Sequence, residues 1–386
     1  MRRVSIIGVG CTSFGKQTGK SIVDLGLEAA IESLKDAGIS SHQIEALYLG
    51  NFAGGMLARQ ELISALLAEA LGIRTAPVTK VEGACASGGI ALRHGYMMVA
   101  AGYFDMVLVV GVEKMTEATT EEVTGVLAAA SDQKTEGSTG LTFPGFFAMM
   151  AQRYLYEHEA DFDCLAHVAL KNRKNAQYNR KAHFYGKPIT LEEIKASRFI
   201  AEPLRLYDCS PISDGACAAV LVAGDRAHQF HRKPIDILGT GQASGSPTLQ
   251  EMESLCSLEA AVKAARNAYE QAGVGPEDID VAEVHDCFSI AELIAIEDLG
   301  LVPRGEAGYR TVKGETQVGG RIAVNPSGGL LSKGHPVGAT GLAQVYEIVH
   351  QLRGTSGNQV PNARVGLLHN VGGIGGVAAV HILGAR

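Results

Sequence analysis

Basic side chains are not in surplus in this sequence: 34 Lys and Arg stand against 41 Asp and Glu, a formal net charge of -7. Binding to nucleic acid phosphates needs an excess of cations, so the composition argues against such a partner. The sequence also lacks an apolar run of the roughly 18 residues that span a bilayer, and its start has no secretory hydrophobic region. We therefore expect a soluble, cytoplasmic protein.

Cysteine pairs with the spacing of a disulfide framework or a metal site are missing as well. The seven cysteines are odd in number, irregular in spacing and form no C-x-x-C motif. The spacing of Cys209, Cys217, His228 and His231 matches no standard zinc ligand set, so no metal site is predicted. Five cysteines are interpreted as buried thiols: Cys11, Cys164, Cys209, Cys217 and Cys256.

A chain of 386 residues is too long for one small core, which suggests two or three domains or one large duplicated domain. The order strand, helix, strand occurs twice, at equal spacing around Ala37-Gly38-Ile39 and Ala272-Gly273-Val274. The first copy covers residues 4–10, 22–37 and 44–49, and the second covers 235–241, 258–272 and 279–284. Two halves of alternating strands and helices predict an α/β protein with a mostly parallel sheet.

The stretch between the halves, residues 115–207, is polar and reads as an insertion or lid. Its later part has helical periodicity and carries a local basic cluster. That cluster indicates either a solvated helix face or a landing site for a phosphorylated ligand. Its members are Lys171, Arg173, Lys174, Arg180 and Lys181.

Cys85 lies in the segment VEGACASGGI, where a predicted strand gives way to a helix. A thiol at a helix N-terminus meets unpaired N–H groups and the positive end of the helix dipole, which favour the thiolate. The small residues around it let backbone and substrate approach closely. A cysteine can also simply pack in a core. The segment therefore indicates a nucleophile or a buried thiol.

Three later segments place reactive side chains near glycines, each after a predicted strand or at the start of a predicted helix. They are EVHDCF with His285 and Cys287, NPSGG with the following GHPVGATG, and HNVGGIGG. Ligands of parallel α/β sheets gather beyond the carboxyl ends of strands, and all three segments are placed there. The sequence thus predicts one site that contains histidines and cysteines.

These motifs resemble the thiolase superfamily over essentially the whole chain, through GACASGG, Ser213-Asp214-Gly215-Ala216 and NPSGGLLSKGHPVGATG. HDCF and HNVGG resemble the sterol-carrier-type and archaeal-type acetyl-CoA acetyltransferases. The resemblance implies an α/β thiolase fold, in which duplicated βαβαβ halves form a layered α-β-α-β-α core with an inserted loop domain. The implied domains are the first half at 1–114 and 208–232, the insertion at 115–207 and the second half at 233–386.

The resemblance also implies catalytic roles in a CoA-dependent Claisen condensation or its thiolytic reverse. Cys85 takes the acyl group and His335 accepts its proton. Cys287 moves the α-proton, because His369 replaces the cysteine that better-known thiolases carry in a terminal Cys-x-Gly motif. His285 and His335 donate to the enolate oxygen, and the Cys85 N–H with one from the 371–373 turn holds the second oxyanion. Supporting residues are Gly372, Gly373, Asn325 and His369.

Coenzyme A and acetyl-CoA are implied as substrates, with no covalently bound cofactor. CoA-binding candidates are Lys171, Lys174, Ser244 and Ser246. The resemblance further implies a homodimer or tetramer, and a small zinc-ribbon and OB-fold partner protein that helps bind CoA. Two alternatives are another condensing enzyme, related to ketosynthases or hydroxymethylglutaryl-CoA synthase, and a non-catalytic acyl-CoA-binding scaffold. Cys287 argues against the first alternative, and the joint presence of Cys85, Cys287, His285 and His335 argues against the second.

Overall fold

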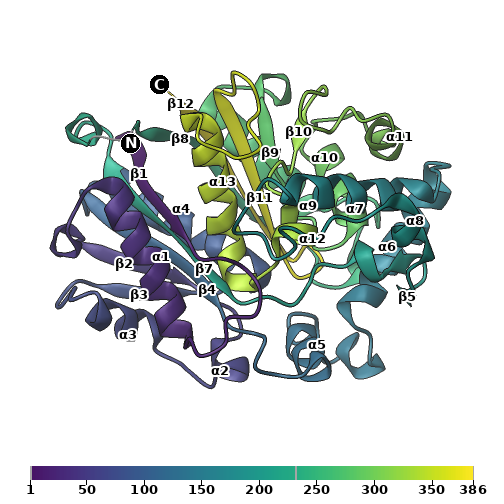
Figure 1. The fold of residues 1–386 in the computed structure, drawn as a ribbon, viewed down its shortest axis with the longest axis horizontal. Helices are drawn as coiled ribbons and strands as arrows, with labels where there is room; N and C mark the ends of the chain where they lie inside the picture. The colour runs from purple at the N-terminus through teal and green to yellow at the C-terminus, as the bar shows by residue number, and fades with distance from the viewer. Residues whose placement is uncertain (1, 231–232, 386) are drawn as a thin grey trace.

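The computed structural model describes residues 2–230 and 233–385 and contains two similar halves (Figure 1). The first half begins with a strand, a helix and a second strand where the sequence predicts them. Ser21 caps the first helix with a side-chain hydrogen bond and Gly38 ends it in the left-handed region, at φ 70°. The elements of this half are β1 (Val4–Cys11), α1 (Ile22–Ala37), β2 (Ala46–Gly50), α2 (Gly54–Leu57), α3 (Ile63–Ala70), β3 (Val78–Val81), α4 (Ser87–Ala100), β4 (Met106–Glu113) and β7 (Gly215–Ala223).

The segment between β4 and β7 forms a largely helical region beside both halves. Its elements are α5 (Thr120–Ala128), α6 (Phe143–Glu157), α7 (Asp163–Ala176), α8 (Leu191–Ala196), β5 (Phe199–Ala201) and β6 (Leu204–Arg205). The domain boundaries given above stay a prediction.

The second half repeats the plan of the first. Its elements are β8 (Ile235–Ser244), α9 (Glu259–Ala272), β9 (Val281–Glu283), α10 (Ser289–Asp298), α11 (Ala307–Val312), β10 (Ala323–Val324), α12 (Gly329–Lys333), α13 (Thr340–Arg353), β11 (Val365–Gly372) and β12 (Val377–Ala385).

All the strands of the two halves join in one sheet of order β10-β9-β11-β12-β8-β1-β7-β4-β2-β3. Read outward from the centre, β8-β12-β11-β9-β10 mirrors β1-β7-β4-β2-β3, and the two series meet where Ser5 pairs with Asp236 and Ile6 with Ile235. The order confirms a duplicated fold.

The prediction of a mostly parallel sheet is wrong. Only the outer strands pair in parallel, β2 with β3 and β4, and β9 with β10 and β11. The central strands β7 and β12 run antiparallel to both neighbours. These two strands are apolar and almost fully buried, and the strand-helix alternation on which the prediction depended does not include them.

Helices cover the sheet in layers, with α4 and α13 packed against each other between the two halves. Their core includes Val107 and Leu368 from facing parts of the sheet. On the outer faces, α1 and α3 cover the first half and α9 and α10 cover the second. This is the expected α-β-α-β-α arrangement. No helix among the described residues is long and apolar enough to cross a membrane.

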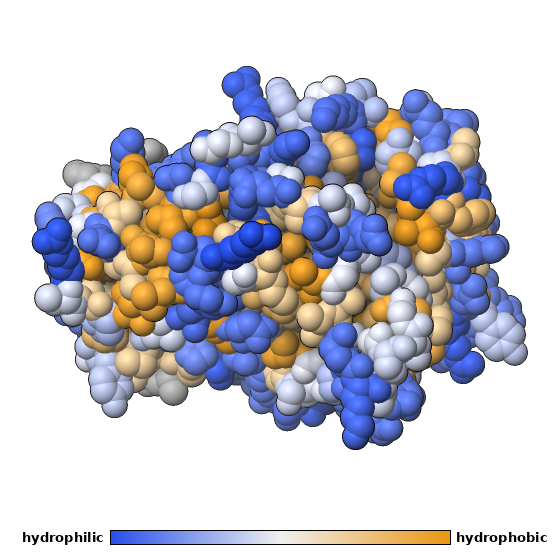
Figure 2. Space-filling model, turned by 90° about the horizontal axis from the view of Figure 1, so that it is seen from below, coloured by the Kyte–Doolittle hydropathy of each residue, from blue (hydrophilic) through white to orange (hydrophobic). Residues whose placement is uncertain are grey.

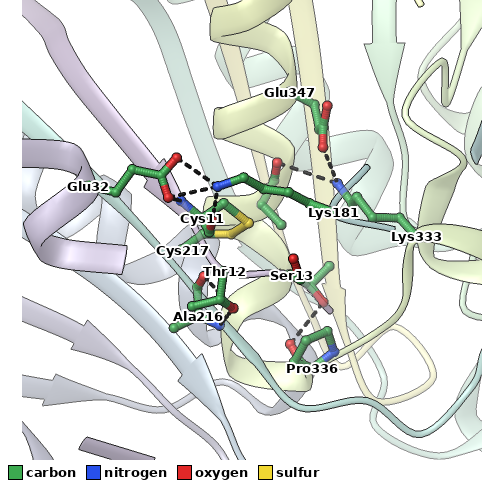
Figure 3. Close-up of a disulfide and its surroundings, with 12 residues drawn as sticks. Cys11, Thr12, Ser13, Glu32, Lys181, Ala216, Cys217, Lys333, Pro336 and Glu347 are labelled. Atoms are coloured by element: carbon green, nitrogen blue, oxygen red, sulfur yellow. Dashed lines mark hydrogen bonds and ion pairs between the residues drawn. A yellow bond between two sulfur atoms is a disulfide. The ribbon is translucent and has the colours of Figure 1, made fainter. Parts of the chain in front are cut away.

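Two cysteines differ from the buried thiols expected. Cys11 on β1 lies directly opposite Cys217 on β7, and the structure joins them in a disulfide. Figure 3 shows this bond beside Lys181, whose ammonium group contacts Glu32 and the Cys11 carbonyl oxygen. Antiparallel register, which linear spacing does not reveal, brings the pair together. Cys164 and Cys256 are buried free thiols, and Cys209 is a half-buried one.

Candidate active site

Cys85 lies in the turn Ala84–Ala86, between the end of β3 and the first residue of α4. Ala84 has a φ of 48°, a left-handed conformation that L-residues seldom adopt. The Ser87 hydroxyl accepts a hydrogen bond from Gly83 N at 3.0 Å and donates one to Ala84 O at 2.6 Å. These bonds hold the turn, so Cys85 stands at a helix N-terminus as predicted.

Glycines let the start of α4 meet the start of α13. A Cβ atom on Gly341 would lie 2.2 Å from Gly89 N, and one on Gly88 would lie 2.8 Å from Gly338 O. Real side chains do not fit at such distances, so the motifs around Cys85 and His335 need these glycines in order to approach.

Two histidines surround the Cys85 sulfur. Sγ of Cys85 and one ring nitrogen each of His285 and His335 lie within 4.8 Å of one another. The two imidazoles meet edge to face, with centroids 5.0 Å apart. Cys287 is 7% exposed and lines the same pocket as Cys85. The structure thus brings together all four residues predicted to be catalytic.

Burial decides the charge state of Cys85. It raises the pKa of this thiol to about 12, against the opposing effect of the Gly373 and Cys85 N–H groups, and the carboxylate of Glu113 raises it further. The expected bias toward thiolate is therefore wrong for the resting protein, because desolvation exceeds the stabilisation at the helix N-terminus. Cys85 needs a base to become a nucleophile.

His335 is placed to be that base. Burial lowers its pKa to about 3, so the imidazole is neutral. Its Nδ1 lies 2.7 Å from Oγ1 of Thr340, whose hydroxyl donates to Pro336 O at 3.2 Å. The threonine has one hydroxyl hydrogen, and its bond to Pro336 O leaves the oxygen as the acceptor for His335 Nδ1; this pairing assigns the imidazole hydrogen to Nδ1. Its Nε2 is then unprotonated and can accept the thiol proton.

His285 has the opposite tautomer. Oδ1 of Asn370 accepts a hydrogen bond from Gly89 N at 3.1 Å, which fixes the orientation of its amide. The Asn370 Nδ2 group therefore donates, to Cys85 O at 2.8 Å and to His285 Nδ1 at 3.2 Å. His285 Nδ1 is an acceptor and the hydrogen of this neutral ring is on Nε2. Burial, with His335 and His369 nearby, lowers the His285 pKa well below its ordinary value.

A buried polar network holds the HDCF segment. Asn325 accepts from Val284 N at 2.8 Å and donates to Glu292 at 2.8 Å. Asn172 on α7 donates to Glu292 at 2.8 Å and to Asp286 at 2.7 Å. Asn325 thus holds the HDCF segment in place, and the inserted region takes part through Asn172.

Three further predicted residues surround the site from the β11 end. Gly373 has a φ of 64° and lies in the turn after Gly372, where its N–H lowers the pKa of the Cys85 thiol. A Cβ on Gly372 would lie 2.3 Å from Gly83 O, so this position needs glycine. His369 is buried and its Nδ1 lies 3.5 Å from His285 N. It positions the HDCF segment and does not line the pocket.

The CoA-binding candidates do not gather at one place. Lys171 is buried and ion-paired with Glu292 at 2.8 Å, so the prediction that it binds phosphate is wrong. Lys174 and Ser244 are exposed, whereas the Ser246 hydroxyl bonds to Thr248 O at 2.9 Å. None of the four lines the pocket described next.

A pocket of about 460 Å³ opens onto Cys85 and Cys287. Its wall is mostly apolar, and its cations are two arginines from the inserted region, Arg173 and Arg198. In the sequence, Arg173 stands out only as one member of the basic cluster, and no motif marks Arg198. Thr340 and Asn370, which set the tautomers, lie inside the GHPVGATG and HNVGGIGG motifs, but no role was predicted for either.

Two groups of side chains among the described residues have the geometry to hold a metal ion. One is Cys85 with His285 and His335, and the other is Glu157 with His158 and Cys256. In the first group Nδ1 of each histidine is already hydrogen-bonded. The prediction that the protein has no metal site stays a prediction.

A protonated thiol, a neutral imidazole beside it and the backbone N–H groups of Cys85 and Gly373 near the sulfur are typical of enzymes that carry acyl groups on a cysteine. Family models agree with this class: "Thiolase, N-terminal domain" matches residues 4–225 and "Thiolase C-terminal domain-like" matches 241–385. The chain belongs to the thiolase family.

Relatives match over almost the full chain. An acetyl-CoA acetyltransferase of Methanothermobacter thermautotrophicus is 47% identical over 99% of both chains. Sterol carrier protein 2 of Bos taurus is 36% identical over 98% of this chain and 71% of its own. Among solved structures, the Ltp2-ChsH2(DUF35) aldolase is 30% identical, with a TM-score of 0.87 over 99% of this chain and 98% of its own. The resemblance stated from the motifs is confirmed.

Proposed function

We propose that the protein is an acetyl-CoA C-acyltransferase that splits a 3-oxoacyl-CoA with CoA, or forms one from acetyl-CoA, through a thioester on Cys85. The observation that carries this proposal is the meeting of Cys85, Cys287, His285 and His335 at one pocket. The acetyl-CoA acetyltransferase at 47% identity supports the acyl donor.

In the thiolytic direction, His335 Nε2 takes the Cys85 proton and the sulfur attacks the 3-oxo carbon. The oxyanion receives hydrogen bonds from the Cys85 and Gly373 N–H groups. When the C2–C3 bond breaks, the acetyl-CoA enolate oxygen accepts a hydrogen bond from His285 Nε2. The enolate carbon takes the proton of Cys287, whose pKa burial raises well above its usual range, so that the proton is present in the resting state.

The second half of the cycle frees the enzyme. CoA gives its thiol proton to the Cys287 thiolate and attacks the acyl group on Cys85. Cys85 leaves as thiolate and recovers its proton from the His335 imidazolium. Condensation is the reverse sequence. While the acyl group is on Cys85, the His335 imidazolium also carries a hydrogen on Nε2. His285 and His335 can therefore both donate to the enolate oxygen, as the resemblance implies.

Rival functions differ in what they need from the cysteines. Decarboxylative condensation needs no second cysteine, and a scaffold needs neither. Aldol cleavage, the activity for which the solved neighbour is named, leaves no acyl group on the enzyme. Cys85 and Cys287 together therefore favour thiolase chemistry.

The experiment is thiolysis of acetoacetyl-CoA by the purified protein, with solvent-deuterium exchange into acetyl-CoA as a second readout. Cys85→Ala should abolish thiolysis. Cys287→Ala should still acquire an acetyl group on Cys85 but lose the exchange of α-protons. Normal exchange in Cys287→Ala would assign proton transfer to another group at the site, such as His285.

For the CoA moiety we propose binding at the pocket rim, with Arg198 as the exposed cation that lines the pocket and Lys174, Ser244 and Ser246 as further candidates. A small zinc-ribbon and OB-fold partner completes this site. The solved neighbour named for a DUF35 complex supports it. Purification without a tag should co-elute such a partner. A protein that binds CoA thioesters at ordinary micromolar concentrations alone would contradict the need for one.

We further propose a homodimer or tetramer in the cytoplasm. β3 is one of the two edge strands of the sheet, and the unpaired backbone of an edge strand favours association. Figure 2 shows apolar surface gathered at the end of the molecule that the first half forms. In the sequence of this half, Leu62 directly precedes α3 and is 68% exposed. Sedimentation that finds a stable, active monomer would contradict association.

A further inference from the structure

The catalytic pocket has an apolar wall, which suits a hydrocarbon acyl chain. Its apolar lining includes Phe52, Leu127, Phe143, Ile212, Phe288 and Leu331. Within this lining stands one buried cation, Arg173 of α7, which is 7% exposed. The mechanism proposed above uses no cation there, so Arg173 needs another explanation.

Arg173 is held by uncharged partners. Its Nε donates to Ser332 Oγ at 3.3 Å and its Nη1 donates to Lys187 O at 3.2 Å. The guanidinium carbon lies 3.8 Å from the ring centre of Phe184 and 5.5 Å from that of Tyr207. Among the described residues, Nη2 has no hydrogen-bond acceptor. The group is thus rigidly placed and still has N–H donors to offer.

Three lysines near this region have carboxylate partners. Lys171 pairs with Glu292 at 2.8 Å, and Lys181 and Lys333 pair with Glu32 and Glu347, as Figure 3 shows for the last two. Among the described residues, no carboxylate oxygen lies within 4.0 Å of the Arg173 guanidinium. A buried charge without a counter-ion is costly, and arginine does not escape that cost by losing its proton.

We propose that Arg173 binds a carboxylate on the acyl group, so that the preferred 3-oxoacyl-CoA has an acidic acyl chain. The proposal rests on the thiolase function stated above. A planar guanidinium matches a carboxylate with two parallel hydrogen bonds, and an apolar wall strengthens the ion pair. Arg173 is then a specificity-determining residue.

The CoA phosphates are the other anions that could reach an arginine. They are highly charged and hydrated, and they sit at the opposite end of the pantetheine arm from the sulfur that reacts at Cys85. Arg198, exposed and lining the pocket, suits that hydrated end. Arg173, enclosed by Phe184 and Tyr207, suits a group inside the pocket.

The test compares 3-oxoadipyl-CoA with 3-oxohexanoyl-CoA, which have the same acyl length and differ in a terminal carboxylate. We expect wild-type kcat/KM to favour 3-oxoadipyl-CoA by at least about tenfold, since a charged hydrogen bond contributes about 1.5–3 kcal/mol. Arg173→Met should lower the ratio of the two kcat/KM values about 10- to 100-fold, and Arg173→Lys should restore part of it. Arg198→Met, the matched control, should lower both values by the same factor.

Binding provides a readout that does not depend on turnover. In a Cys85→Ala background, adipyl-CoA should bind more tightly than hexanoyl-CoA, and Arg173→Met should remove the difference. Equal binding of the two, or an equal loss for both thioesters in Arg173→Met, would overturn the proposal and indicate a CoA phosphate contact or a structural role. Absence of wild-type turnover with both 3-oxo substrates would instead count against the thiolase function.

Discussion

Thr340 is predicted to control catalysis without touching the substrate, by holding His335 in the tautomer that leaves Nε2 unprotonated. Thr340→Val keeps the β-branched shape at the start of α13 but removes the oxygen 2.7 Å from His335 Nδ1. A buried donor left without its acceptor costs about 1–3 kcal/mol. His335 can avoid that cost by moving its hydrogen to Nε2, and it then cannot accept the Cys85 proton.

The same 1–3 kcal/mol, applied to the acylation barrier, predicts that Thr340→Val slows the acylation of Cys85 about 5- to 150-fold. Single-turnover release of CoA from acetyl-CoA measures this step. Thr340→Ser retains the hydroxyl and should stay within about threefold of wild type, and imidazole ¹⁵N shifts should report the tautomer change in the valine variant alone. Wild-type acylation by Thr340→Val with an unchanged His335 tautomer would refute the argument.

Three other outcomes follow from the site. Asn370→Ala removes the donor that keeps the hydrogen of His285 on Nε2, so it should weaken stabilisation of the enolate. The rate of α-proton exchange should fall more than the rate of Cys85 acetylation. An equal fall in both rates would contradict the role assigned to Asn370. Alkylation of Cys85 by iodoacetamide should rise with pH from 7 to 10 without a plateau, since burial raises its pKa to about 12, whereas a plateau near pH 7 would indicate a thiolate-imidazolium pair. Burial raises the pKa of Glu113 from 4.5 to about 7, so the contribution of this group to the free energy of unfolding is fully present below pH 4.5 and is lost as pH rises through 7. Glu113→Gln should flatten the fall of the unfolding free energy with pH, measured by urea unfolding. An unchanged pH dependence in this variant would contradict the prediction.

The first half shows how far local sequence predicts this fold. The helix from Ile22 to Ala37 has the ends that the sequence predicts, because its apolar spacing and the glycine that ends it agree; the structure adds the Ser21 cap. The antiparallel strands β7 and β12 were not predicted, because their apolar residues give no sign of direction. Pairing direction depends on how distant segments meet, as does the contact of Cys11 with Cys217.

At the site, motifs predicted which residues meet but not their charge states. The position of Cys85 at a helix start was correct, yet the depth of burial that opposes its ionisation depends on segments far along the chain. The basic cluster shows the same limit. Helical geometry turned Lys171 toward Glu292, left Lys174 exposed and placed Arg173 in the pocket, although all three are near neighbours in sequence.

The central claim is that Cys85 carries the acyl group, and acetyl-CoA labelling followed by peptide mass spectrometry tests it most directly. Brief incubation of the wild-type protein with acetyl-CoA, then digestion, should place one acetyl group on the peptide that contains Cys85, and Cys85→Ala should acquire none at the site. Acetylation of Cys287 or another residue in place of Cys85, with full thiolysis by Cys85→Ala, would contradict the account.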